Sequence, residues 1–274
     1  MSVAAQATLD ASPPAVTTPA TGVTSPAMVS AHRGAEQAGH FGGHVDYVEL
    51  DVQRCGDGTF VLFHNDHVHV DGSRIPVAGL TFCQFAALTG RALRYDDALW
   101  ALARRGQRAH LDLKFVSPPA AYRDPASTFE VAATRLAVDA LGRDNVIVTT
   151  LEDPSVLAVR RWACAHDLDE LLVGLSLGRR CATMSRVDAL RTHTSELFPH
   201  DRYLRCAANL VVAHHWLARL GVARFAAHRH LPLLVWTVDA MADLRYWLQP
   251  GRAWMVTTNR PEHALQIRGL AAWA

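Results

Sequence analysis

The chain has 274 residues, half of them hydrophobic and 19% charged, with a formal net charge of +1 at pH 7. This length is typical of one barrel-sized domain, and the near-neutral charge argues against a polyanionic partner such as nucleic acid. No apolar stretch reaches the roughly 18 to 20 residues that a membrane-spanning helix needs, so we expect no transmembrane segment.

The cysteines and the amino-terminal composition bear on the compartment. The five cysteines are odd in number, scattered and without a CxxC pair, which favours a reducing compartment over a disulfide framework. Residues 1–27 are rich in Ala, Thr, Pro and Ser but lack the basic start and apolar run of a secretory signal. We therefore expect a disordered leader over 1–27, a single domain over 28–274 and a cytoplasmic location.

From residue 28 onward, short Val- and Leu-rich runs alternate with longer amphipathic segments. The alternation predicts eight strands, at 28–33, 47–52, 109–114, 146–150, 171–176, 209–213, 233–238 and 254–258. It predicts seven helices, at 96–105, 127–141, 154–166, 185–197, 216–230, 240–248 and 261–270. Such an order favours a parallel sheet with right-handed crossovers, and eight repeats favour closure into a single (β/α)8 TIM barrel. An open doubly wound sheet is the alternative.

Two irregularities interrupt the alternation. Asp57-Gly58 is a hairpin signal, which predicts that the second strand is followed by a returning run at 60–64. The first crossover, 34–46, is short and contains four glycines. We therefore expect the first helix to be short or missing, and we hypothesise that its loss reshapes the substrate pocket.

The run 48–52 places two carboxylates on one face of a strand. Because alternate residues of a strand share a face, Glu49 and Asp51 point to one side and their apolar neighbours to the other. In a barrel the apolar side faces the helices, so both carboxylates point inward. Residues 111–114 repeat this pattern, with Asp112 and Lys114 inward.

Three inward carboxylates repel one another when desolvated, and a bound cation removes that cost. The all-oxygen set Glu49, Asp51 and Asp112 suits a hard divalent ion, Mg²⁺ or Ca²⁺. The alternative for each carboxylate is a buried ion pair with an arginine or with Lys114. Lys114 is the only lysine among 27 basic residues, which indicates a compact ammonium that contacts a phosphate oxygen.

Two histidines lie where strand ends open onto the predicted site. His32 follows the first apolar run, and His64 ends the run 60–64. Histidine accepts or donates a proton near neutral pH, and displacement at a phosphodiester needs one group of each kind. A zinc site with both as ligands is an alternative. Four nearby histidines compete for the catalytic role: His40, His44, His67 and His69.

Trp236 lies near the carboxyl end of the predicted strand 233–238. One interpretation is a core tryptophan. The other is an apolar wall against the substrate's leaving group.

Six segments in this order resemble the glycerophosphodiester phosphodiesterase family: AHRG (31–34), VELDVQRCGDGTFVLFHND (48–66), HLDLKF (110–115), VIVTTLEDPSVL (146–157), LVWTVD (234–239) and MVTTNRPEHAL (255–265). The resemblance extends from residue 28 nearly to the end and implies a phospholipase C-like phosphodiesterase barrel. It implies an acid/base pair of His32 and His64, with Arg33 and Lys114 as phosphate contacts. It also implies the metal ligands already reached from strand alternation, Glu49, Asp51 and Asp112.

The chain departs from the family pattern in two places. The family's Pro-Glu-Asn-Thr segment after His-Arg-Gly is missing, and the third ligand, usually glutamate, is Asp112 here. Asp112-Leu113-Lys114, together with 236–239, also looks like the related sphingomyelinase D/phospholipase D-type enzymes. Those enzymes use the same barrel but can let a substrate hydroxyl attack phosphorus and release a cyclic phosphate.

We therefore expect a metal-dependent phosphodiesterase that cleaves a glycerophosphodiester or a similar small or lipid-derived phosphodiester. A lyase that releases a cyclic phosphate is one alternative, and a non-catalytic phosphodiester-binding barrel is another. The sequence leaves open the substrate alcohol, the choice between Mg²⁺ and Ca²⁺, and the oligomeric state.

Overall fold

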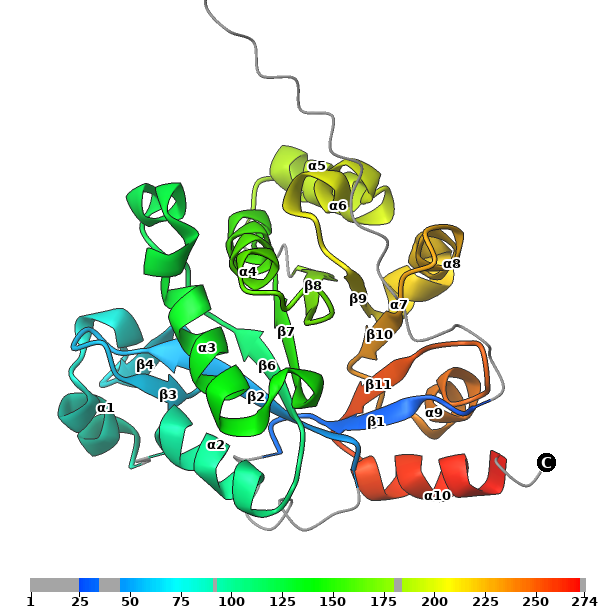
Figure 1. The fold of residues 1–274 in the computed structure, drawn as a ribbon, viewed down its shortest axis with the longest axis horizontal. Coiled ribbons are helices and arrows are strands. Elements are labelled where there is room, and N and C mark those ends of the chain that lie inside the picture. The colour runs from blue at the N-terminus through cyan, green and yellow to red at the C-terminus, as the bar shows by residue number, and fades with distance from the viewer. Residues whose placement is uncertain (1–24, 35–44, 91–92, 180–183, 272–274) are drawn as a thin grey trace, which may run out of the picture.

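A computed structural model describes residues 25–34, 45–90, 93–179 and 184–271. Within them eight parallel strands close into a barrel, because β1 pairs with both β2 and β11 (Figure 1). The barrel strands are β1 (Met28–Ala31), β2 (Tyr47–Arg54), β6 (Ala109–Leu113), β7 (Val146–Thr150), β8 (Leu172–Leu177), β9 (Leu210–His214), β10 (Leu233–Trp236) and β11 (Met255–Thr258). The predicted (β/α)8 barrel is confirmed, and the open-sheet alternative is wrong.

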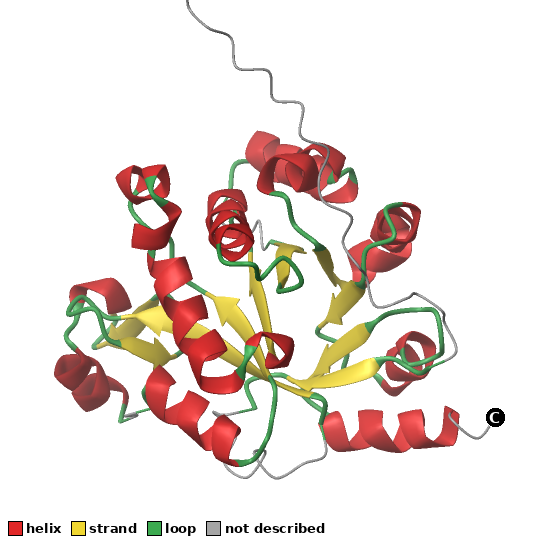
Figure 2. Cartoon of the chain, viewed as in Figure 1, coloured by secondary structure: helices red, strands yellow, loops and turns green. Residues whose placement is uncertain are grey.

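Helices surround the barrel strands on the outside (Figure 2). They are α2 (Tyr95–Arg104), α3 (Phe129–Leu141), α4 (Asp153–Ala165), α5 (Arg186–Leu197), α6 (His200–Cys206), α7 (His215–Leu217), α8 (Ala223–His228), α9 (Met241–Trp247) and α10 (Pro261–Ala271). Six predicted helices are confirmed to within two residues at each end. The seventh, 216–230, is wrong as one continuous helix. A π-helical turn over Ala218–Val222 separates α7 from α8, because the backbone of Gly221 leaves the helical conformation.

The predicted hairpin is confirmed, since β3 (Phe60–Leu62) runs antiparallel to the end of β2. Beyond it lie elements that the sequence analysis missed: β4 (His67–Val70), β5 (Ser73–Pro76) and α1 (Phe82–Thr89). They enclose a small core of their own, which includes Val61, Val68 and Phe85. A capping box between Thr81 and Gln84 starts α1, and this spacing was a readable helix signal.

The interior of the barrel is divided into an apolar and a polar layer. Toward the amino ends of the strands, the inward side chains form an apolar cluster of Tyr47, Ile147, Leu210, Val212, Leu234 and Met255. Gly174 makes room for it, since a Cβ there would lie 2.4 Å from the Val212 side chain. Inward polar side chains follow toward the carboxyl ends. Because the bottom of the barrel is packed, the polar site opens at one end only.

Some predictions fall outside the described residues. Residues 1–24 of the predicted leader and 35–44 of the first crossover are among them, and so are His40 and His44. The disordered leader and the short or missing first helix therefore stay predictions. None of the helices in the described part of the chain is long and apolar enough to cross a bilayer.

Candidate active site at the carboxyl end of the barrel

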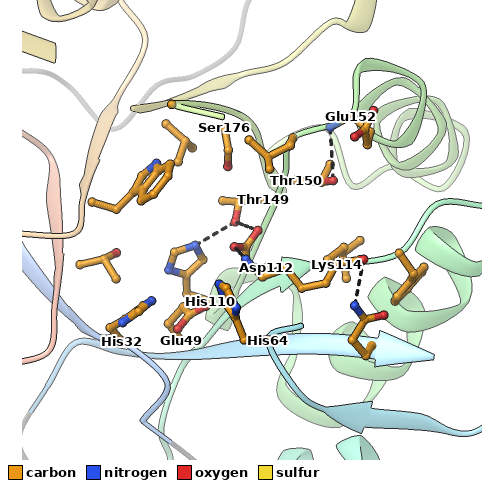
Figure 3. Close-up of a pocket in the computed structure, with 18 of the residues that line it drawn as sticks. His32, Glu49, His64, His110, Asp112, Lys114, Thr149, Thr150, Glu152 and Ser176 are labelled. Carbon is orange, nitrogen blue, oxygen red and sulfur yellow. Dashed lines mark hydrogen bonds and ion pairs between the residues drawn. The ribbon is translucent and has the colours of Figure 1, made fainter. Parts of the chain in front are cut away.

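A cleft of about 780 Å³ opens among the carboxyl ends of the strands (Figure 3). Seven of the eight predicted site residues line it: His32, Arg33, Glu49, His64, Asp112, Lys114 and Trp236. The eighth, Asp51, lies deeper, with 1% of its surface exposed. Residues spread over more than 200 positions of the chain are thus brought together at one site.

The three predicted ligands form one carboxylate cluster. Glu49 and Asp51 extend from β2, and Asp112 extends from β6, where it is the register partner of Asp51. One oxygen from each carboxylate lies within 4.8 Å of the other two. Val48 and Leu50 pack in the outer core, as the alternation predicts. Within the described residues, this is the one group of three or more possible ligands, and it contains no histidine.

Electrostatics in this cluster oppose full ionisation. Burial raises the pKa of Glu49 well above its ordinary value, and the charges of Asp51 and Asp112 raise it further. Burial also disfavours the ionised form of Asp51, but nearby cations, Lys114 first among them, lower its pKa overall. The cluster can therefore hold a divalent cation, which would let all three carboxylates ionise.

Two cationic side chains border the carboxylates. The backbone N–H of Arg33 donates to Glu49 Oε2 at 2.6 Å, and its Nε donates to Asp51 Oδ2 at 3.0 Å. Lys114 Nζ lies 3.0 Å from Asp51 Oδ1 and donates to Asp112 Oδ2. Burial alone would lower the pKa of Lys114, but the carboxylates, Asp112 first, raise it overall. The Lys114 ammonium consequently keeps its charge.

His32 is held by an asparagine from the opposite end of the chain. His32 Nδ1 lies 2.7 Å from Asn259 Oδ1, and Asn259 Nδ2 donates to Asp239 Oδ2 at 2.7 Å. Since the amide nitrogen faces Asp239, its oxygen accepts a hydrogen from His32 Nδ1, which leaves the lone pair on Nε2. Burial lowers the pKa of His32, although the Asn259 hydrogen bond opposes this. Burial thus favours the neutral imidazole of His32, whose lone pair on Nε2 can accept a proton.

His64 follows β3 and is exposed to the cleft, with its Nδ1 3.0 Å from Asn65 Oδ1. Figure 3 shows its ring at the same edge of the cleft as His32 and Glu49. His67 and His69 contact each other, with their Nε2 atoms 3.0 Å apart, and neither lines the cleft. Of the histidines in the described part of this segment, His64 is therefore the one that reaches the site.

The other side of the cleft is formed by the ends of β8, β10 and β11. The Trp236 ring lies against His214, with 5.3 Å between ring centroids, and close to Gly178. A Cβ on Gly178 would lie 3.2 Å from that ring. Ser176 and Thr257 also line this side. The cleft thus has one half, on β1, β2 and β6, that holds the carboxylate cluster and its cations, and a second half lined by hydroxyls, apolar groups and the ion pair of Glu152 and Arg179.

Several lining residues were missed by the sequence analysis. His110 has the same inward parity as Asp112, so the alternation that found one could have found the other. Burial lowers the pKa of His110 to about 3. Glu152 and Arg179 form an ion pair of 2.7 Å at the cleft, although they belong to different strand–helix units. No local sequence signal marks that pair.

Comparison with known proteins identifies the fold. No protein-family model and no curated protein matches the sequence, but solved structures do. A glycerophosphodiester phosphodiesterase from Agrobacterium tumefaciens superimposes with a TM-score of 0.59 at 18% identity, over 90% of this chain and 100% of that one. One from Parabacteroides distasonis gives 0.66 at 15%, over 90% and 99%. The chain has the glycerophosphodiester phosphodiesterase fold.

A third similar structure was solved with a ligand bound to it. An Oleispira antarctica phosphodiesterase, solved in complex with the product sn-glycerol-3-phosphate, gives a TM-score of 0.61 at 14% identity, over 88% of this chain and 96% of that one. The phospholipase C-like barrel expected from the motifs is thereby confirmed. Identities this low establish the fold alone, so the activity has to be argued from the residues of the cleft.

Proposed function

We propose that this protein is a metal-dependent phosphodiesterase that cleaves a glycerophosphodiester or a similar small or lipid-derived phosphodiester. The observation that carries the proposal is the convergence, in one cleft, of a carboxylate cluster, two cationic side chains and two histidines. This combination meets the needs of displacement at phosphorus, which are neutralisation of charge and the transfer of two protons.

The carboxylate cluster is the proposed metal site. Its donors are hard oxygens, which suit Mg²⁺ or Ca²⁺, and burial together with the charges of Asp51 and Asp112 raises the pKa of Glu49, a cost that a bound cation would remove. When bound, the ion would supply positive charge to a non-bridging oxygen of the phosphodiester. The Arg33 backbone N–H holds Glu49 in place, and Lys114 does the same for Asp112.

The chain's own cations and histidines carry the remaining roles. Lys114 and the Arg33 guanidinium stabilise the charge that develops on the phosphoryl oxygens. His32 is the base, since its Nδ1–H donates to Asn259 Oδ1, which leaves Nε2 as the ring nitrogen with the lone pair. As the nucleophile's oxygen bonds to phosphorus, Nε2 takes its proton. His64 donates a proton to the leaving alkoxide as the bond between phosphorus and that oxygen breaks.

The half of the cleft that faces the carboxylate cluster is the proposed site for the alcohol portion of the substrate. Trp236 supplies an apolar wall, and Ser176 and Thr257 offer hydroxyl groups. A cleft of about 780 Å³ is large enough for a small diester. The product sn-glycerol-3-phosphate in the Oleispira antarctica structure supports a substrate of that size.

Phosphorus NMR tests the proposal directly. The metal-stripped protein is incubated with glycerophosphocholine before and after Mg²⁺ or Ca²⁺ is added, and we expect glycerol 3-phosphate to appear only with the ion. A cyclic phosphate signal would instead establish the lyase alternative. Absence of turnover with either ion would move the search to other diesters and would favour a specialised or non-catalytic barrel.

Three variants test the assigned histidines. His32→Ala and His64→Ala should each lower turnover by roughly 10²- to 10⁴-fold while the melting temperature is unchanged. His228→Ala, at an exposed position at the end of α8, is the matched control and should keep full activity. Full activity in either cleft variant would contradict the mechanism.

A further inference from the structure

A buried chain of hydrogen bonds lies beneath the carboxylate cluster and is not used by the reaction above. It runs from Ser30 on β1 through His110 on β6 to Thr149 on β7 and back to Asp112 on β6. Ser30 Oγ lies 3.2 Å from His110 Nδ1, and His110 Nε2 lies 3.1 Å from Thr149 Oγ1. Thr149 Oγ1 in turn donates to Asp112 Oδ1 at 3.2 Å (Figure 3).

The direction of each hydrogen bond follows from the chemistry at the ends. The other partner of Thr149 Oγ1 is the carbonyl oxygen of Leu111, at 3.2 Å. A carboxylate and a carbonyl only accept, so the single hydroxyl hydrogen of Thr149 points toward them. Thr149 Oγ1 must then accept a hydrogen from His110 Nε2. In a neutral ring this leaves Nδ1 as the acceptor for the Ser30 hydroxyl.

The barrel explains why these four side chains meet. Ser30, His110, Thr149 and Asp112 all have inward parity, and Asp112 and Thr149 are register partners on adjacent strands. Ser30, His110 and Thr149 are exposed by 0%, 3% and 1%, respectively. Bulk water therefore cannot replace a lost partner in this chain, and each donor depends on the next protein acceptor.

We propose that His110 is a positioning residue for the metal site. By donating from Nε2, it fixes the Thr149 hydroxyl, which then holds Oδ1 of Asp112 and sets the orientation of that carboxylate beside Glu49 and Asp51. The role rests on the proposed function, because the ion that Asp112 would help to bind is the ion of the proposed reaction. The competing role is a packing one, in which only the volume of the ring matters.

Four substitutions in the full chain separate the two roles. His110→Phe keeps the ring volume and removes the donor, whereas His110→Gln keeps an amide N–H that reaches the position of Nε2. Thr149→Val removes the hydroxyl, and Thr149→Ser keeps it. Each variant is stripped of metal, checked by thermal unfolding, and titrated with Mg²⁺ and with Ca²⁺ by calorimetry in the absence of substrate.

We expect His110→Phe and Thr149→Val each to weaken ion binding by roughly 10- to 100-fold, as loss of a group that orients a ligand does. His110→Gln and Thr149→Ser should stay within about threefold of the unaltered protein, since each retains the donor. The double variant His110→Phe/Thr149→Val should bind no more weakly than either single variant, because both break the same path.

Three results would overturn the proposal. One is unchanged ion affinity in His110→Phe. Another is an equal loss of ion affinity in His110→Gln and His110→Phe, which would show that His110 acts through packing. The third comes from nitrogen NMR of the unaltered protein, which should show the hydrogen of the His110 ring on Nε2, and a hydrogen on Nδ1 alone would contradict it. The NMR test holds even where a variant fails to fold.

The same titration, combined with the activity assay, distinguishes failure of the positioning role from failure of the proposed function. An unaltered protein that binds the ion but cleaves no phosphodiester would refute the function and leave the positioning role standing. A protein that cleaves phosphodiesters equally well with and without the His110 donor, at unchanged ion affinity, would refute the positioning role and leave the function standing.

Discussion

Replacing Lys114 by methionine should destabilise the metal-free protein strongly. Asp51 is fully buried at its side chain, and Lys114 lies 3.0 Å from its Oδ1. Removing one partner of a buried ion pair costs about 3–5 kcal/mol, because the other charge stays buried. Arg33 also contacts Asp51, at 3.0 Å, and partly compensates, so we expect about 3 kcal/mol. For a chain of this size that corresponds to a melting temperature lower by roughly 6–12 °C.

The assay is thermal unfolding at pH 7.5 with a chelator, repeated with Mg²⁺, which should restore part of the loss by supplying positive charge. The folded state raises the pKa of Lys114 above its ordinary value of 10.5, so this stabilisation is fully present below that pH and is lost only above it. Lys114→Arg is the matched control. It keeps the charge and should keep most of the stability, but should lose roughly 10²-fold in turnover because a guanidinium does not replace a compact ammonium. Equal melting temperatures for Lys114→Met and the unaltered protein in chelator would refute this account of the cluster.

Three further predictions concern the pH dependence of the carboxylate cluster, the wall of the cleft beside Trp236, and a buried carboxylate that does not line the cleft. Folding raises the pKa of Glu49 in the metal-free protein, so the free energy of unfolding should fall as the pH rises from 4.5 through that raised value. Ion affinity should rise over the same range, and ion binding should release a proton from Glu49. Calorimetry in two buffers of different ionisation enthalpy measures that proton, and a pH-independent affinity would contradict the prediction. Gly178→Ala should lower kcat/KM. The backbone of Gly178 has φ +124°, and a new Cβ would lie 2.6 Å from His214 Cβ, so the His214 and Trp236 side chains that form this wall would have to move. Steady-state kinetics would show this, and unchanged kinetics would mean that the wall does not contact the substrate. Glu130 is fully buried and accepts from Tyr122 at 2.5 Å, from Ser155 at 2.6 Å and from Ser117, so Glu130→Ala should lower the free energy of unfolding by about 3 kcal/mol in urea titrations. A loss under 1 kcal/mol would show that water satisfies those donors.

The missed and the mistaken elements have different physical causes. The segment with β4, β5 and α1 is short and packs on its own small core, so it has neither the length nor the periodicity of a barrel unit. The helix predicted over 216–230 has the right amphipathic pattern, but the backbone at Gly221 interrupts it. The first segment is thus not a barrel unit at all, whereas in the second the amphipathic period does not show where the backbone leaves the helix.

The sequence by itself determined the architecture and predicted most of the charged residues that line the cleft. Eight Val- and Leu-rich runs separated by amphipathic helices allow few other folds, and the period of two in a strand turns Glu49, Asp51 and Asp112 inward once the apolar face is committed to the helices. These are local properties, visible within a few neighbouring residues.

Only the tertiary structure decided which of these residues touch. His32 meets Asn259 across 227 positions, and His110 meets Ser30 across 80. Such contacts depend on the register between neighbouring strands and on the closure of β1 against β11, which no local pattern encodes. The sequence therefore predicted the chemistry of the cleft, whereas the barrel determined the hydrogen bonds that hold each group at its position.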